Sequence, residues 1–283
     1  VGNDIDGEIG GDSSGIGLDL SNDGSIIAIG STGHDSSKGH VRVFQNQSNS
    51  WVQLGNDIDG EAIGDNSGGA VSLSEDGTVL AIGSANNDGG GNDRGHTRIF
   101  KNIGNNWVQI GDDIDGEADN DNSGTDVALS SDGSKVAIGA QNNRGVNGVQ
   151  SGHVRIFKNI DNTWIQIGDD IDGENKNDQS GSSVSLSSNG TIVAVGARNN
   201  DGVNGIQSGH VRIFEIIGNT WVQVGNEIEG ENEGDVSGEE GVKLSGDGKI
   251  IAIGAMANDD NGNNSGHVRV YRYSLSSSTS SSS

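Results

Sequence analysis

A sequence unit of about 57 residues recurs along this chain, and the repetition limits its fold more than any other feature. One tryptophan marks each of four copies: Trp51, Trp107, Trp164 and Trp221. A Gly-His pair occurs five times, with its histidines at His40, His96, His153, His210 and His267. Self-similarity at this period is typical of proteins in which each repeat is one small unit that packs on its neighbours.

Each unit contains four short strand candidates and no helical pattern. In the third copy an alternating segment ends at Leu129, an Asp-Gly pair follows at 132–133, and an apolar run follows at 136–138. Asp-Gly tolerates the positive φ of a tight hairpin, so these two segments are expected to pair antiparallel. The Gly-His-Val-Arg-Ile-Phe segment (152–157) supplies a third strand and the Trp segment a fourth. Five such units predict an all-β protein, a five-bladed β-propeller with four antiparallel strands per blade.

The repeat is circularly permuted relative to the two chain ends. Residues 1–2 (Val-Gly) match the end of the Trp segment at 224–225, whereas the fifth copy has Ser278 where its Trp would stand. We expect residues 1–272 to form one propeller domain and residues 273–283 to form a Ser-rich tail or linker. Because an outer edge without its last strand is a template for another strand, head-to-tail self-assembly through the fifth blade is also predicted.

The charge balance excludes several partners. The chain carries 41 acidic and 16 basic side chains, for a formal net charge of −25. Such acidity repels nucleic-acid phosphates and anionic membranes, and no apolar run is long enough to insert into a bilayer. Without cysteine there is no disulfide, thiolate metal site or cysteine nucleophile. The expected partners are other protein chains or extracellular glycans.

The Ser-Gly-x-x-Val and Ala-Ile-Gly-Ala segments resemble the FG-GAP repeat of integrin α-subunit propellers. They are more similar still to extracellular bacterial and algal repeats of the form Trp-x-Gln-x-Gly-x-Asp-Ile-Asp-Gly-Glu. The resemblance covers nearly the whole chain apart from the Ser-rich tail, and it implies an extracellular or cell-surface location. Ser123 replaces the Phe of Phe-Gly, and the family's Asp-rich calcium loop shrinks to the Asp-Gly turn at 132–133. The family's calcium site is therefore not expected at that turn.

An acidic motif, Asp-Ile-Asp-Gly-Glu followed four residues later by Asp, crosses from each unit to the next. Carboxylates around a Gly bend are oxygen ligands of the kind that Ca²⁺ takes, so Ca²⁺ is the predicted ion. The alternative is turn chemistry, in which the carboxylates accept backbone N–H bonds and pair with strand arginines. The candidate Ca²⁺ ligands are Asp57, Asp59, Glu61, Asp65, Asp113, Asp115, Glu117, Asp121, Asp170, Asp172, Glu174 and Asp178.

One arginine and one tryptophan per unit are expected to be structural. The arginine follows the Gly-His histidine by two residues and is expected to tie the third strand to the crossover carboxylates. The Trp, its flanking Gln and this arginine are expected to stack by cation–π contact, with sugar stacking as the alternative use of the Trp. The arginines are Arg42, Arg98, Arg155, Arg212 and Arg269. A metal ring of the five histidines is not expected, because the third strand lies outside the propeller channel.

Three Asn-x-Ser/Thr sequons are candidate glycosylation sites: Asn46, Asn189 and Asn263. All three fall in predicted surface turns or loops, as glycosylation requires.

No catalytic constellation is visible in the sequence. The Ser, His and Asp residues recur in every unit, whereas an active site usually breaks repeat symmetry, and the unmatched His34, Arg144 and Met256 form no recognisable triad. The sequence therefore predicts that the chain is not an enzyme. It predicts an extracellular structural or adhesive module of a larger cell-surface or filamentous assembly. The alternatives are a multivalent lectin with one site per blade and a calcium-dependent glycosidase-like enzyme.

Overall fold

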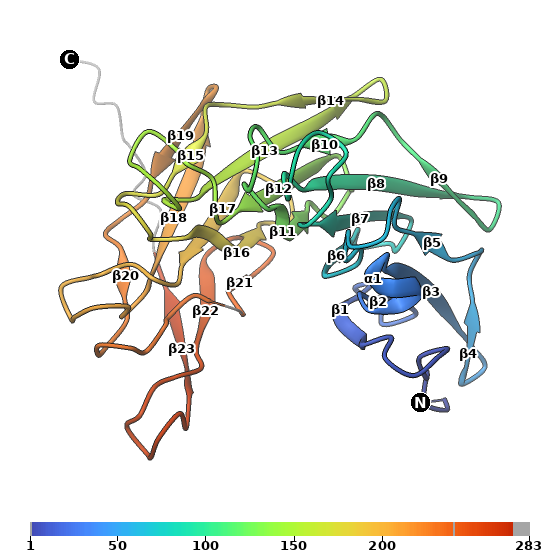
Figure 1. The fold of residues 1–283 in the computed structure, drawn as a ribbon, viewed down its shortest axis with the longest axis horizontal. Coiled ribbons are helices and arrows are strands. Elements are labelled where there is room, and N and C mark those ends of the chain that lie inside the picture. Colours follow the sequence, from blue (N-terminus) through green and yellow to red (C-terminus); the bar gives the residue numbers. More distant parts are fainter. Residues whose placement is uncertain (1, 240, 274–283) are drawn as a thin grey trace.

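The structure is a computed structural model that describes residues 2–239 and 241–273. These residues form five antiparallel β-sheets arranged around a common axis, with one four-residue helix, α1 (His34–Ser37), in a loop (Figure 1). The predicted all-β, five-bladed β-propeller is therefore confirmed. None of the described residues belongs to a helix that is long and apolar enough to cross a membrane. The predicted Ser-rich tail beyond Tyr273, with Ser278, lies outside the described residues.

Each of the first four blades follows the chain from its first strand to its Trp strand, and a short fifth segment extends the outer edge. Blade 1 contains β1 (Ser14–Leu20), β2 (Ile26–Ser31), β3 (His40–Gln47), β4 (Ser50–Gln53) and β5 (Ile58–Asp59). Blade 2 contains β6 (Ala70–Leu73), β7 (Val79–Ser84), β8 (His96–Ile103), β9 (Asn106–Gln109) and β10 (Ile114–Asp115). Blade 3 contains β11 (Ser123–Leu129), β12 (Lys135–Ala140), β13 (His153–Ile160), β14 (Thr163–Gln166) and β15 (Ile171–Asp172). Blade 4 contains β16 (Ser180–Leu186), β17 (Ile192–Ala197), β18 (His210–Ile217), β19 (Thr220–Gln223) and β20 (Ile228–Glu229). Blade 5 contains β21 (Lys243–Leu244), β22 (Ile250–Ala255) and β23 (His267–Arg272).

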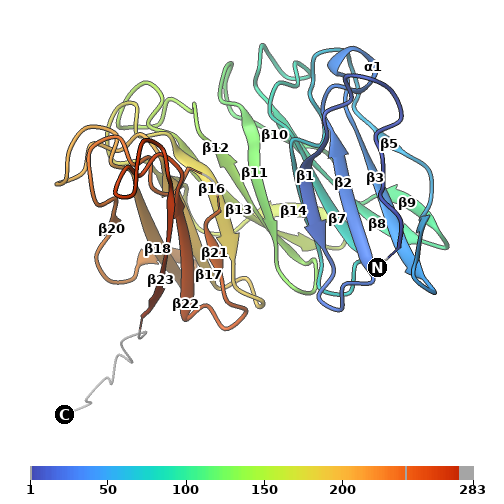
Figure 2. The same ribbon diagram turned by 90° about the horizontal axis from the view of Figure 1, so that it is seen from below.

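The Asp-Gly pairs form the hairpins that the sequence predicts. In blade 3, Leu129 pairs with Val136 across the turn, and Gly133 has a φ of +66°. The Asp132 carboxylate accepts hydrogen bonds from the Ser130 hydroxyl at 2.7 Å and the Ser134 N–H at 2.9 Å. These short turns lie at one end of the blades, whereas the longer loops, including α1, lie at the other end (Figure 2). The rigid ring thus presents its longer loops on a single face.

The hydrophobic core lies between the blades rather than inside any one of them. At the first junction, Ile26, Ala28, Val41 and Val43 of blade 1 pack with a cluster from blade 2 that includes Leu80. Three further clusters join blades 2 and 3, blades 3 and 4, and blades 4 and 5. Because strand side chains alternate between two faces, each inner blade contributes one face to each neighbour. We call these regions the blade junctions.

The glycine of Ala-Ile-Gly brings two backbones into contact at each junction. A Cβ added to Gly139 in β12 would lie 2.0 Å from the carbonyl oxygen of Gly181 in the next blade. The matching position in β17, Gly196, would meet the carbonyl oxygen of Gly238 at 2.1 Å. Only a residue without a side chain allows this approach, which explains why the glycine recurs in every unit.

The change Gly139→Ala should destabilise the protein by about 2 kcal/mol or more, because the new methyl group meets backbone that cannot rotate away. The matched control is Gly10→Ala, at a glycine where an added Cβ would meet nothing within 4 Å. Urea unfolding of the two variants measures the difference. Equal stability of the two variants would show that the junction can widen without loss.

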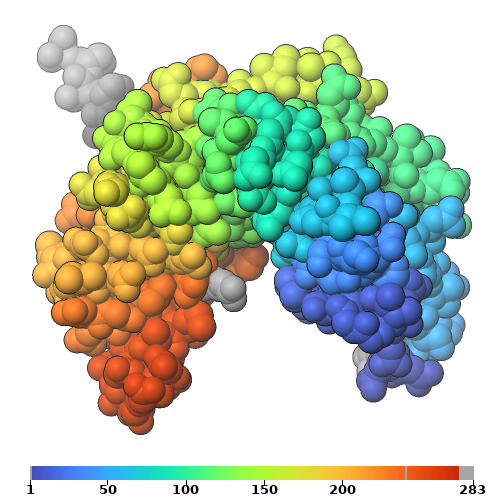
Figure 3. Space-filling view, viewed as in Figure 1, coloured from blue at the N-terminus to red at the C-terminus, as the bar shows by residue number. Residues whose placement is uncertain are grey.

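The ring is open between its first and last blades (Figure 3). Val268 and Val270 of blade 5 are 69% and 65% exposed, whereas their counterparts Val41 and Val43 in blade 1 are 0% and 1% exposed. Within the described residues, β23 pairs only with β22, so blade 5 has three strands and no Trp strand, as its sequence predicts. Blades 1 and 5 therefore each retain one uncovered face.

Candidate metal centres at the blade junctions

The last Asp of each acidic crossover is buried and caps a turn. The Asp121 carboxylate accepts hydrogen bonds from the Glu117 N–H at 3.0 Å, the Ala118 N–H at 2.8 Å and the Asn143 side chain at 3.0 Å. Asp65 and Asp178 accept equivalent bonds in the neighbouring crossovers. These carboxylates hold the crossover loop in shape, which is the turn-chemistry alternative for this position.

The middle acidic residue of the motif binds the arginine of the next blade through its backbone carbonyl. The carbonyl oxygen of Asp59 accepts a hydrogen bond from Arg98 of the next blade at 2.6 Å, and that of Asp172 accepts one from Arg212 at 2.7 Å. Asp115 accepts the equivalent bond from Arg155. The side chains of these acidic residues belong to none of the clusters described below.

The remaining two carboxylates of each crossover face different histidines. In the crossover after blade 2, Asp113 faces His96 of its own blade, whereas Glu117 faces His153 of blade 3. The structure therefore does not gather the four predicted Ca²⁺ ligands of one crossover around a single point. Calcium binding by these acidic residues remains a prediction, with the carboxylates divided between two junctions.

Each blade instead carries one compact group of histidine and acidic side chains, which we call a junction cluster. The ligand atoms within a cluster all lie within 4.8 Å of one another. The clusters are Glu8, His34 and His40; Glu61, His96 and Asp113; Glu117, His153 and Asp170; Glu174, His210 and Glu227; and Glu231, Asp260 and His267. Sequence reasoning missed these groups, although the paired recurrence of Gly-His and of the acidic motif was the signal that could have found them.

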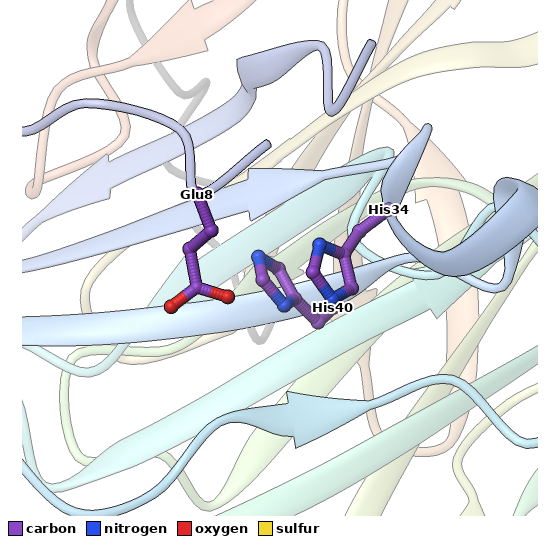
Figure 4. Close-up of side chains that lie close together, drawn as sticks. All are labelled: Glu8, His34 and His40. Atoms are coloured by element: carbon purple, nitrogen blue, oxygen red, sulfur yellow. The ribbon is translucent and has the colours of Figure 1, made fainter. Parts of the chain in front are cut away.

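The blade 3 cluster shows the geometry most fully. Nδ1 of His153 lies 3.8 Å from Oε2 of Glu117 and 3.7 Å from Oδ2 of Asp170. The first strand position of β13 buries the histidine, while both carboxylates remain partly exposed. In blade 1, the Glu8 carboxylate points toward His40, whose ring stacks on His34 at a centroid distance of 4.0 Å (Figure 4). A buried nitrogen facing two carboxylates from two crossovers could hold a divalent metal ion.

Burial keeps the histidines of the blade 3 and blade 4 clusters neutral. Loss of water contact, together with the charge of the neighbouring Arg155, lowers the pKa of His153 to about 4. The same two causes lower the pKa of His210 to about 3. At neutral pH these two rings therefore each carry one free nitrogen lone pair, which is the form that binds metals.

Acid should weaken the metal-free fold through these histidines. In the unfolded chain a histidine takes up a proton near pH 6.5, whereas His153 and His210 in the fold take one up only near pH 4 and 3. The unfolded state therefore binds more protons below about pH 6.5, so stability falls as pH decreases through that window. In chelator, the double variant His153→Gln with His210→Gln should lose less stability than wild type between pH 7 and 5. Equal losses, measured by urea unfolding at each pH, would contradict this explanation.

The repeated arginines tie consecutive blades. The guanidinium of Arg98 donates to the Asp59 carbonyl, lies 4.0 Å from the Glu61 carboxylate and stacks 5.4 Å from the Phe100 ring centre. The cation–π partner is therefore the phenylalanine two residues along the same strand, and the predicted stack on the Trp is wrong. Residues two apart on a strand point to the same face, which places this ring under the guanidinium.

The tryptophans form a second tie between blades. The indole N–H of Trp107 donates to the Leu54 carbonyl of blade 1 at 2.8 Å, and Trp164 donates in the same way to Ile110 of blade 2. Trp221 donates likewise to the preceding blade. A Cβ at Gly55 would lie 3.0 Å from the Trp107 ring, and the Trp51 ring has Gly2 in the corresponding place. One part of each ring is thus covered by backbone, which limits the sugar-stacking alternative.

Replacing Arg98 with Met should lower stability by about 2 kcal/mol, because the Asp59 carbonyl loses a charged donor at a buried junction. Arg144→Met is the matched control, since Arg144 is exposed in the loop between β12 and β13. Chemical unfolding of the two variants gives the comparison. A loss at Arg98 no larger than the loss at Arg144 would show that the tie contributes nothing.

The glycosylation candidates occupy different settings. Asn189 and Asn263 are exposed in turns, as predicted. Asn46 lies near the end of β3 rather than in a loop, and its side-chain oxygen accepts the Asn49 N–H at 3.1 Å.

A hollow of about 330 Å³ lies where inner segments of all five blades meet, and its lining breaks the repeat symmetry. Asp126, Arg198 and Lys243 line it, and Arg198 donates to Glu239 at 2.7 Å. Burial raises the pKa of Asp126, although the Val184 N–H bonds to its carboxylate. Sequence reasoning considered His34, Arg144 and Met256 as the unmatched residues and missed this group. Aligning the innermost strands would have found it, since Ala70 and Ser183 occupy the position of Asp126.

The fold is shared with proteins of diverse origin. A hydrazine synthase of Kuenenia stuttgartiensis matches with a TM-score of 0.57 at 16% identity, covering 92% of this chain and 71% of that chain. A candidate 6-phosphogluconolactonase of Bacteroides uniformis matches with a TM-score of 0.54 at 14% identity, covering 92% and 81%. TolB of Acinetobacter baumannii matches with a TM-score of 0.54 at 12% identity, covering 90% and 51%. At these identities the likeness shows the β-propeller fold alone.

No protein-family model matches the chain, and no curated protein sequence matches it significantly. The resemblance to FG-GAP repeats therefore stays a resemblance, while the propeller fold that it implies is shown. The prediction that the chain is not an enzyme is wrong, because this fold does not exclude catalysis. Structures with the same fold include the candidate lactonase and the synthase. Repeat symmetry misled that prediction, since the innermost strands carry polar residues that have no counterpart in the other blades.

Proposed function

We propose that the chain is a structural or adhesive module that associates with further copies of itself at the cell surface. The uncovered faces of blades 1 and 5 are the observation that carries this proposal. Every other blade face in the described structure packs against a neighbouring blade, and these two do not. A chain with one free face of each kind can extend an assembly at either end.

The free face of blade 1 is apolar and turned away from blade 2. Ile16, Leu18 and Leu20 alternate along β1, so they share one side of the strand, and all three are exposed. The opposite side of β1 meets blade 2, where the Asp19 carboxylate accepts the Leu73 N–H at 2.6 Å. Three exposed large apolar side chains in one row are a typical protein-docking surface.

The free face of blade 5 matches the face that blade 1 offers to blade 2. Val268 and Val270 occupy the positions of Val41 and Val43, which are fully buried at the first junction. The uncovered face of blade 5 therefore corresponds to one side of a blade junction, and the uncovered face of blade 1 corresponds to the other side. Contact between blade 5 of one copy and blade 1 of the next is heterologous, and a heterologous contact that does not close a ring continues as a filament.

Surface charge and sequons support an extracellular setting. The net charge of −25 favours solubility and opposes contact with nucleic acid. Asn189 and Asn263 are exposed and accessible to glycosylation. Protein chains of the same kind are the partners that this proposal names.

The change Val270→Glu should reduce self-association by about tenfold or more, because a carboxylate would enter an apolar contact. The matched control is Val203→Glu, at a residue that is 87% exposed in a loop outside both free faces. Sedimentation velocity over a range of concentrations measures the association. A wild-type chain that stays monomeric at high concentration, or equal effects of the two variants, would contradict the proposal.

A further inference from the structure

The junction clusters of blades 2, 3 and 4 each contain a histidine that is fully buried. His210 is 1% exposed, and neither Nδ1 nor Nε2 has a hydrogen-bond partner. His96 and His153 are also 1% exposed, and in both it is Nδ1 that faces the carboxylates of the cluster. Buried polar atoms are paired in most proteins, so the unpaired Nδ1 of His210, which faces a carboxylate, requires an explanation.

The distances to the facing carboxylates are too long for hydrogen bonds. Nδ1 of His96 lies 3.8 Å from Glu61 and 3.7 Å from Asp113, and Nδ1 of His210 lies 4.0 Å from Glu174. Hydrogen bonds between such groups measure roughly 2.7–3.2 Å. Two ligand atoms on one tetrahedral zinc ion lie about 3.4 Å apart, given metal–ligand bonds near 2.1 Å. A small contraction of each cluster would therefore place its three ligand atoms around one ion.

The arginine beside each cluster leaves room for an ion. Nη1 of Arg155 lies 3.9 Å from Oε1 of Glu117, whereas the other oxygen of that carboxylate, Oε2, faces His153. The carboxylate can therefore serve the arginine with one oxygen and the ion with the other. The second carboxylate, from Asp170, offsets the charge of the guanidinium.

The donor set selects the class of ion. One imidazole nitrogen and two carboxylate oxygens suit zinc and related first-row divalent ions, with a fourth position open to water or another ligand. Calcium takes six to eight oxygen ligands, and a cluster with two carboxylates and a nitrogen offers too few. Four clusters have this donor set, those of His96, His153, His210 and His267. The first three histidines are 1% exposed, whereas the His267 side chain is 20% exposed.

We propose that the junction clusters of blades 2, 3 and 4 are binding sites for a zinc-class divalent cation. The ion joins a carboxylate from the preceding crossover to a histidine and a carboxylate of the following blade. It therefore links two blades at their outer edge. This inference is independent of the proposed self-association, because its residues lie away from both uncovered faces.

The test measures zinc bound to the full chain by equilibrium dialysis, followed by metal analysis. The double variant Glu117→Gln with Asp170→Asn removes both carboxylates of the blade 3 cluster. The matched control, Asp115→Asn with Asp169→Asn, removes two carboxylates from the same crossovers that belong to no cluster. We expect the first variant to bind one zinc ion fewer per chain than wild type, and the control to bind the same number as wild type.

Cobalt provides a second readout that does not depend on a variant's folding. Cobalt bound to the wild-type chain should show the strong visible absorption of a four-coordinate site, and zinc should abolish that absorption. An equal zinc content in both double variants would overturn the proposal. So would a cobalt spectrum like that of the free aqueous ion, or displacement of zinc by an equal concentration of calcium.

Discussion

Contact between consecutive blades is the interaction on which the rest of this structure depends. Among the described residues, most buried apolar side chains belong to clusters that join neighbouring blades, and none of these clusters lies within a single blade. Backbone approach at Gly139 and Gly181 brings the blades close enough for those clusters to form. In repeat proteins, stability is approximately a sum of unit and neighbour-interface contributions. Here the neighbour contribution dominates, because each sheet alone would expose both faces.

The same junction also brings the chemistry-bearing residues together. An acidic crossover runs from one blade to the next. Its first carboxylate therefore faces the histidine of the preceding blade, and its Glu faces the histidine of the following blade. Arginine and tryptophan close the junction through backbone carbonyls of the preceding blade, at Asp59 and Leu54. A buried histidine then meets two carboxylates from consecutive copies of the motif: the Glu of one copy and the first acidic residue of the next. The repeat thus builds a polar cluster at every blade as a consequence of its connectivity.

Much of the fold could be predicted from the sequence, because it depends on local turn and strand chemistry. The Asp132-Gly133 hairpin, the alternation of strand residues and the recurring Trp were sufficient to predict the blades and their number. The division of Asp113 and Glu117 between two histidines was not predictable, because it depends on the rotation from one blade to the next. Arg98 stacks on Phe100 rather than on Trp107 for the same reason, since only the packed structure shows which ring lies on its side. The group around Asp126 could have been predicted from the sequence, because Asp126 differs from the residues at the same position in the other repeats.

If junctions supply most of the stability, blades with two junctions should be more stable than blades with one. Hydrogen exchange followed by mass spectrometry tests this directly, because exchange of strand amides reports local opening. Peptides from β12 and β17, in the inner blades, should exchange more slowly than peptides from β2 and β22, in the end blades. Equal protection of all four strands in a monomeric sample would contradict the account, because each blade would then be stable without its neighbours.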